Sequence, residues 1–204
     1  MTGTGPLEQI VPGILERFAA KNTAREQALA ASRVIIRNSA NAIRAVHRGE
    51  FEAARRLIAE ARATHDAATH ALQGHADVYH AGFLHDAQKE YVEAVTTLHL
   101  CTGGPIPDPA QLRVEDAAYL NGIGEAVGEL RRVILDRLRA GRFDGCEALL
   151  AAMDDIYNVL VTIDYPDAMT GGLRRTTDQV RGILEKTRGD LTLAIVTRRP
   201  APTE

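Results

Sequence analysis

Apolar residues recur every three to four positions along almost the whole chain, and this periodicity most narrowly limits what the chain can fold into. Between residues 6 and 48, for example, Ile14, Phe18, Ile35 and Ile43 return at helical spacing. No stretch alternates between apolar and polar residues over the length of a β-strand. The sequence therefore predicts an all-α protein.

Breaks in this pattern place the predicted helices. Gly49 suits the end of the first helix, and the prolines and glycines of residues 102–112 mark an irregular loop. The type of segment 190–196 stays open. We predict one domain over residues 1–204, a bundle of about six to seven helices, with flexible ends at 1–5 and 197–204. The predicted helices are Pro6–Arg48, Phe51–Leu72, Tyr79–Leu100, Glu115–Ala140, Phe143–Ile163 and Leu173–Thr187.

Charge and composition exclude several classes of protein. The net charge is −3, so any polyanionic partner must be met by a local basic patch. No apolar run approaches the ~18–20 residues of a membrane span, and no signal peptide is apparent, so no membrane partner is expected. Cys101 and Cys146 are too few for a disulfide framework and too far apart for a metal knuckle. We expect a cytoplasmic location.

Two pairs of glutamates lie among apolar and small residues of the predicted helices. Glu90 and Glu93 are three residues apart in QKEYVEAV, and Glu125 and Glu129 are four apart in GIGEAVGEL, so each pair shares a helical face. The glycines beside the second pair each cost roughly 1 kcal/mol of helix stability relative to alanine. Such glycines are tolerated where a neighbouring backbone or a ligand comes close.

Convergence of these four carboxylates would raise their pKa values through burial and mutual repulsion. A divalent cation would remove that conflict, and an all-oxygen ligand set favours Mg²⁺, Mn²⁺ or Ca²⁺ over zinc. Glu90, Glu93, Glu125 and Glu129 are therefore the candidate metal-binding and catalytic residues. Spacing alone is better explained by solvated glutamates on exposed helix faces, with Glu129 paired to Arg131 or Arg132.

A second candidate surface is basic. Residues 32–49 contain four arginines and one histidine and no acidic residue. Arg33, Arg37, Arg44 and Arg48 follow one another at steps of four, seven and four, so they form one helical stripe. Because stacked arginines repel one another unless an anion lies among them, the stripe favours phosphate binding. An ordinary solvated face is the alternative.

The histidines do not indicate a metal array. Five of them, from His65 to His85, fall every five residues, but this step rotates roughly 140° around a helix, so they share no face. Asp77-x-x-His80 is similar to the Glu-x-x-His of di-iron bundles, where the motif occurs twice, and here it occurs once. The sequence contains no P-loop, dinucleotide fingerprint or nucleophile elbow.

The chain resembles the translin family, specifically its catalytic branch, translin-associated factor X (Trax) and the archaeal and bacterial Trax-like proteins. The resemblance implies an all-α fold of about seven helices, a hollow homo-octamer, binding of single-stranded RNA or DNA within the shell, and Mg²⁺-dependent endonucleolytic cleavage of RNA. The matching segments cover most of the chain: SANAIRAVHRGEFEAAR (39–55), QKEYVEAV (88–95), AYLNGIGEAVGELRR (118–132), DDIYNVLVTIDYP (154–166) and LRRTTDQVRGILEKTRGDLTLA (173–194).

The resemblance also assigns residues. Glu90 and Glu93 match the acids of the family's first catalytic motif, which here carries a lysine after Gln88. Glu129 matches the glutamate of the second motif, and Glu125 stands where the catalytic branch has aspartate, one methylene shorter. The non-catalytic branch has apolar residues at positions 90, 93 and 125. The resemblance thus implies a metal site at these glutamates.

The resulting expectation is a Mg²⁺-dependent endoribonuclease that acts on single-stranded RNA inside a homo-oligomeric shell, with Mn²⁺ as a second possible metal. The alternative is a non-catalytic protein of the translin type that binds single-stranded nucleic acid. A third interpretation, a carboxylate-bridged redox metal protein, is disfavoured by the absence of a second Glu-x-x-His motif.

Overall fold

The computed structural model describes residues 5–198, and within them the chain is built from helices without a β-strand. Three of the described helices are single turns in the connections, α3 (Ala76–Tyr79), α5 (Pro109–Leu112) and α8 (Asp167–Thr170). The long helices are α1 (Gly5–His47), α2 (Phe51–Ala71), α4 (Phe83–Thr102), α6 (Asp116–Arg139), α7 (Cys146–Leu160) and α9 (Leu173–Val196). The predicted all-α fold is confirmed.

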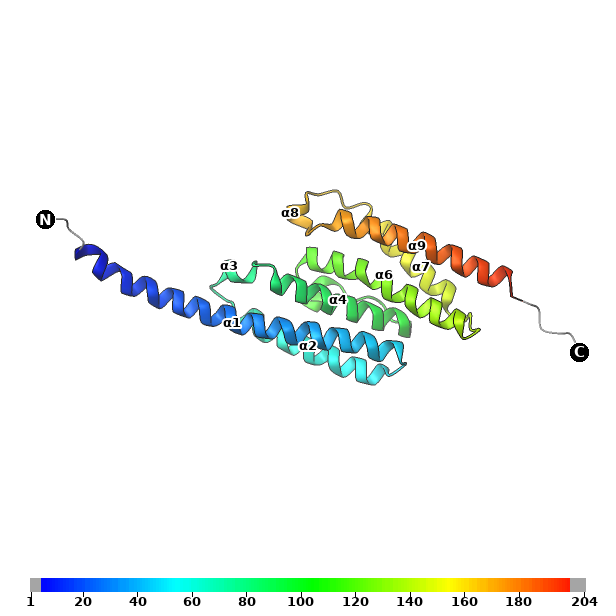
Figure 1. The fold of residues 1–204 in the computed structure, drawn as a ribbon, viewed down its shortest axis with the longest axis horizontal. Helices are drawn as coiled ribbons and strands as arrows, with labels where there is room; N and C mark the ends of the chain where they lie inside the picture. Colours follow the sequence, from blue (N-terminus) through cyan, green and yellow to red (C-terminus); the bar gives the residue numbers. More distant parts are fainter. Residues whose placement is uncertain (1–4, 199–204) are drawn as a thin grey trace, which may run out of the picture.

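The long helices lie side by side in a bundle (Figure 1). Helix α1 packs against α2 and α4, α4 packs against α6, and α6 packs against α7 and α9. The N-terminal part of α1 extends beyond the bundle, and residues 7–20 are mostly exposed. Helices α4 and α6 therefore form the middle of the bundle, with α1 on one side and α9 on the other.

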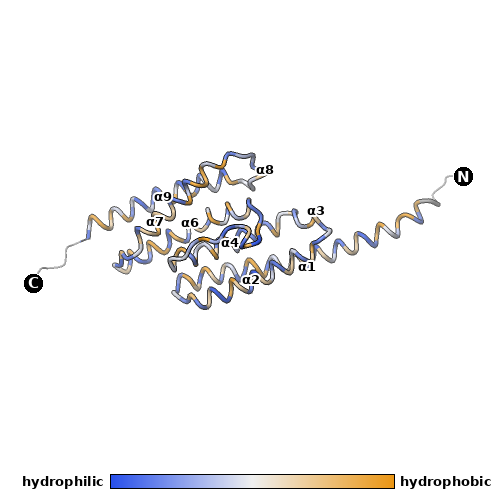
Figure 2. Tube along the Cα trace, turned by 180° about the vertical axis from the view of Figure 1, so that it is seen from behind, coloured by the Kyte–Doolittle hydropathy of each residue, from blue (hydrophilic) through white to orange (hydrophobic). Residues whose placement is uncertain are grey.

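The core follows the periodicity of the sequence. Figure 2 shows hydrophobic positions that recur along each helix. The buried members of the main core include Ile35 of α1, Tyr91 of α4, Leu130 of α6 and Leu184 of α9. Burying side chains of this size contributes roughly 1.5–3 kcal/mol each. Among the described residues, no helix combines the length and apolarity needed to cross a bilayer.

The largest differences between the predicted helices and the structure lie at the start of α4 and the end of α9, and α7 is three residues shorter at each end than predicted. The helix predicted over Tyr79–Leu100 is interrupted, because Gly82 adopts a φ of 96°, and α4 begins only at Phe83. The segment 190–196, whose type the sequence left open, continues α9 without a break. Pro12 lies within α1 near its start and does not end the helix. Of the ends expected to be flexible, residues 1–4 and 199–204 lie outside the described residues.

Two glycines of α6 allow its close contacts with the neighbouring helices. A Cβ atom on Gly122 would lie 2.7 Å from the Lys89 carbonyl oxygen and 2.7 Å from the Val92 Cβ of α4. A Cβ atom on Gly124 would lie 2.5 Å from the Thr176 Cγ2 of α9. At these two positions α6 has glycine because its backbone lies too close to the neighbouring helices for a side chain. Gly122 sets the distance between α4 and α6.

We expect Gly122→Ala to lower the free energy of unfolding by about 1–3 kcal/mol, because the added methyl group forces α4 and α6 apart. Gly182→Ala on α9 is the matched control, since nothing lies within 4 Å of its added Cβ. This control should raise stability by about 0.5–1 kcal/mol through the loss of glycine flexibility. Urea unfolding followed by circular dichroism measures both; equal effects at the two positions would contradict the close α4–α6 contact.

Candidate metal centre and nucleic-acid interface

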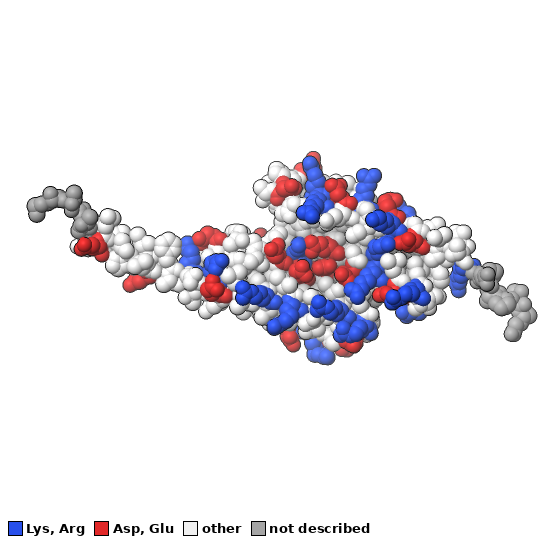
Figure 3. Space-filling model, in the orientation of Figure 1, with Lys and Arg blue, Asp and Glu red and all other residues white. Residues whose placement is uncertain are grey.

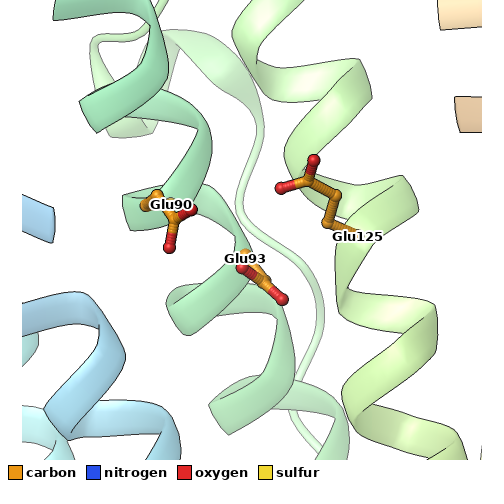
Figure 4. A group of neighbouring side chains, drawn as sticks. All are labelled: Glu90, Glu93 and Glu125. Carbon is orange, nitrogen blue, oxygen red and sulfur yellow. The ribbon is translucent and has the colours of Figure 1, made fainter. Parts of the chain in front are cut away.

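Three glutamates meet between α4 and α6. Glu90 and Glu93 of α4 and Glu125 of α6 each offer one carboxylate oxygen, and these oxygens lie within 4.8 Å of one another. Figure 4 shows the three side chains gathered where the two helices face each other. We call these residues the glutamate trio. All three are partly buried, so the trio is neither fully solvated nor enclosed in the core.

Local sequence and helix packing together produce this arrangement. The three-residue step from Glu90 to Glu93 places both side chains on the same face of α4. Helix α6 comes close enough to add Glu125 because Gly122, one turn earlier, carries no side chain against Lys89 and Val92. The arrangement of the trio therefore depends on the close contact of Gly122 with α4 as well as on the three glutamates themselves.

The electrostatics of the trio oppose full ionisation. Burial raises the pKa of Glu93 to about 8, and the nearby charges of Glu90, Glu125 and Glu129 act in the same direction. Burial and the charge of Glu125 also raise the pKa of Glu90. At neutral pH the trio thus holds a proton on Glu93 unless a cation compensates the charges.

Lys89 supplies part of that compensation. Its Nζ donates a hydrogen bond of 2.9 Å to Oε1 of Glu125. Burial lowers the pKa of Lys89, but the hydrogen bond to Glu125 and the charges of Glu125, Asp86 and Glu90 together leave this pKa above its ordinary value. The sequence did not single out Lys89, although its position inside the acidic motif was the available signal.

Glu129 is held apart from the trio by His47. The carboxylate of Glu129 forms a hydrogen bond with Nε2 of His47, from the end of α1, and lies 3.9 Å from Nη1 of Arg132. The bond from His47 lowers the pKa of Glu129, so this carboxylate stays ionised at neutral pH. It remains close enough to raise the pKa of Glu93. The structure therefore brings three of the four predicted acids together. The fourth, Glu129, lies beside them and is hydrogen-bonded to His47.

His47 is a site residue that sequence reasoning missed. Its side chain is only 7% exposed, and its Nδ1 is buried without a hydrogen-bond partner in the described part of the chain. The histidine lies within the basic segment already noted, but its contact with Glu129 spans 82 residues of sequence. Only the packing of α1 near α6 brings the two together.

The predicted arginine stripe lies exposed along α1. Arg33, Arg37, Arg44 and Arg48 are all exposed. Arg48 is neutralised, because its Nε and Nη2 donate to the two oxygens of Glu50 at 2.9 and 2.6 Å. The other three form no ion pair within residues 5–198. Figure 3 shows basic side chains along α1 beside the acidic group of α4 and α6.

The residues present suit a hard divalent cation. The trio offers only carboxylate oxygens, the donors that Mg²⁺ and Mn²⁺ prefer. Burial, and after it the charges of neighbouring carboxylates, raise the pKa values of Glu90 and Glu93 despite the opposing charge of Lys89. Among the described residues, no other group of acids, histidines or cysteines meets in this way.

Comparison with known proteins finds similar proteins that match almost the whole of this chain. No protein-family model matches. An uncharacterized protein of Methanocaldococcus jannaschii is 31% identical over 184 residues, covering 87% of this chain and 79% of that protein. The crystal structure of C3PO from Archaeoglobus, a translin/Trax-type protein, has a TM-score of 0.86 and 32% identity, covering 92% of this chain and 98% of the other.

Two further structures are similar. C3PO from Archaeoglobus in complex with duplex RNA has a TM-score of 0.80 and 30% identity, covering 92% of this chain and 97% of the other. C3PO from Nematostella, without ligand, has a TM-score of 0.81 and covers 90% of this chain and 96% of the other. At 21% identity, this last similarity shows the fold alone.

Proposed function

Since this chain belongs to the translin family, we propose that it is a Mg²⁺-dependent endoribonuclease that binds and cleaves single-stranded RNA, and also binds single-stranded DNA. The observation that carries the proposal is the glutamate trio. Three carboxylates within 4.8 Å of one another, with a pKa of about 8 at Glu93, form a site that favours a cation. Acids stand at all three positions, as the resemblance to the catalytic branch implies, with glutamate in place of aspartate at position 125.

Glu90, Glu93 and Glu125 would hold the metal, and Glu129 stands beside them. The chemistry that Mg²⁺ supplies when bound is activation of water and stabilisation of charge on the scissile phosphate. Glu93 would be deprotonated when a bound cation compensates the negative charge of the trio. His47 keeps Glu129 ionised and fixes the direction of its carboxylate, so Glu129 is available as a further ligand or as a proton acceptor.

The arginine stripe would hold the nucleic-acid backbone. Arg33, Arg37 and Arg44 are exposed and free of acidic partners among residues 5–198, whereas Arg48 is occupied by Glu50. Contacts to phosphates give affinity with little sequence preference. The complex of Archaeoglobus C3PO with duplex RNA supports nucleic-acid binding in this family. Single-stranded and duplex RNA should both be tested.

We expect the protein to act as a homo-oligomer, with an octamer as the predicted size. Large apolar side chains on the extended part of α1 and at the end of α9 are exposed in the single chain, which favours burial against other copies. They include Leu7, Ile10, Leu15, Phe18, Leu193 and Val196. The cytoplasmic location stays a prediction from the sequence.

Homogeneous protein and a labelled single-stranded RNA test the activity directly. Internal cleavage should require Mg²⁺ or Mn²⁺, stop with EDTA and return when excess Mg²⁺ is added. Cleavage that persists in EDTA would contradict the proposal. RNA binding without any cleavage would instead favour the alternative, a non-catalytic translin-type binding protein. The ion pair between Lys89 and Glu125 favours that alternative, because it already neutralises one acid of the trio.

Replacing Arg37 and Arg44 together by alanine should weaken RNA binding about tenfold at moderate salt. It should also reduce the slope of log K against log salt by about 1.4, because each phosphate contact contributes about 0.7 on single strands. Arg175→Ala with Arg181→Ala on α9 removes the same charge from another exposed surface and should change neither quantity. Equal losses in the two double variants would show that net charge, and not the stripe, determines binding. Fluorescence anisotropy at several salt concentrations measures both.

A further inference from the structure

A cavity of about 650 Å³ lies on another side of α4, between α2, α4 and the connection that follows α4. Its volume is within the range typical of small-molecule sites, about 300–1,000 Å³. Helix α4 contributes Tyr91, Val95 and Leu98, which recur at helical spacing on one face. Glu93 falls between them in sequence and so points roughly away from the cavity, toward the trio. The cavity is therefore separate from the proposed metal site.

The charged side chains that line this cavity are all positively charged. Arg55 and Arg62 of α2 line it, and no aspartate or glutamate does; the ring of His99 of α4 forms another part of the wall. Arg55 and Arg62 are seven residues apart, so they project from the same face of α2. Arg55 also pairs with Glu52, whose side chain is 79% exposed and lies outside the lining. Most of the remaining wall is apolar, including Ile58 of α2.

The connection after α4 is fixed in place around the cavity. Nη2 of Arg62 donates a hydrogen bond of 2.9 Å to the Gln111 carbonyl oxygen. A Cβ atom on Gly104 would lie 3.2 Å from Nδ1 of His99, so the backbone at Gly104 lies against this ring. The Asp108 capping box holds the start of α5. These contacts give a cavity formed before any ligand arrives, with N–H groups of Arg55 and Arg62 still available.

We propose that this cavity binds a small organic anion, one phosphate or carboxylate group carried on an apolar body. The apolar wall takes the body of the ligand, and the arginines take the anionic group through charge-assisted hydrogen bonds. Two sources share this chemistry, a nucleoside monophosphate and a medium-chain carboxylate. The inference needs no metal and does not rest on the proposed nuclease activity.

Isothermal titration calorimetry on the full chain in EDTA buffer tests the proposal with AMP, octanoate, adenosine and inorganic phosphate. AMP, octanoate or both should bind, and adenosine and inorganic phosphate should bind at least about tenfold more weakly, because each lacks one half of the required chemistry. Binding of AMP alone or octanoate alone identifies the source. Absence of binding by both AMP and octanoate overturns the proposal.

Matched variants locate the binding. Arg55→Gln and Arg62→Gln should each weaken binding about tenfold, and Arg56→Gln, which removes an exposed arginine outside the cavity, should leave it unchanged. Arg62→Gln also removes the hydrogen bond to Gln111 and could disturb the loop. Arg55→Gln leaves that bond intact, so it tests the proposal independently. The Arg37→Ala, Arg44→Ala variant should still bind AMP. Loss of binding in that variant, or no loss in Arg55→Gln, would place the anion elsewhere and overturn the proposal.

Discussion

Replacing Glu93 by glutamine is expected to lower Mg²⁺-dependent RNA cleavage by about a hundredfold or more, while RNA binding stays within about twofold. Glutamine keeps the size of the side chain but removes the charge at the most buried position of the trio. Because the arginine stripe on α1 is untouched, affinity for the phosphate backbone should remain. Single-turnover cleavage and fluorescence anisotropy on the same preparation separate the two effects.

Glu147→Gln is the matched control for this substitution. Glu147 is an exposed glutamate in the first turn of α7, outside the trio, so its replacement should leave cleavage and binding unchanged. Unchanged cleavage by Glu93→Gln, with the same Mg²⁺ requirement as the unsubstituted protein, would remove the trio from the mechanism. Equal losses in both variants would indicate a general effect of charge.

The second large effect is on stability in the absence of metal. The pKa of Glu93 in the folded protein is about 8, above its ordinary value of 4.5, so the folded state holds this proton more tightly than the unfolded state does. The resulting stabilisation is fully present below about pH 4.5 and is lost as the pH rises through 8. The contribution of Glu93 should therefore decrease by at most about 5 kcal/mol across this window, at ~1.4 kcal/mol per pKa unit.

Urea unfolding in EDTA, from about pH 5 to about pH 8.5, measures this contribution as the difference between the unsubstituted protein and Glu93→Gln. The variant should become the more stable of the two as the pH rises, because its amide has no charge to bury. Mg²⁺ at high pH should stabilise the unsubstituted protein more than the variant. A difference that does not change with pH would contradict the raised pKa of Glu93.

Much of the fold follows from local sequence. The helical periodicity of α1, α2, α6 and α7 predicts their existence and most of their ends to within a few residues. The break before α4 was missed because Gly82 acts through a positive φ, which a periodicity pattern does not reveal. The sequence left the type of residues 190–196 open, because that stretch is short and contains several β-branched and apolar residues; it continues α9.

The candidate site was less fully predictable. Spacing predicts that Glu90 and Glu93 share a face, but only the contact between Gly122 and α4 adds Glu125 to them. The pairing of His47 with Glu129 and of Lys89 with Glu125 depends on helix packing between residues far apart in the sequence. The first contact lowers the pKa of Glu129 and the second places a positive charge beside Glu125, and no spacing rule shows either.

The central claim is that the glutamate trio binds a divalent cation, and the most direct measurement is crystallography of the protein with Mn²⁺, using anomalous scattering. The predicted result is an anomalous peak within coordination distance of carboxylate oxygens from Glu90, Glu93 and Glu125, lost in Glu93→Gln crystals grown and treated in the same way. Mn²⁺ bound at other positions with none between α4 and α6 would contradict the account.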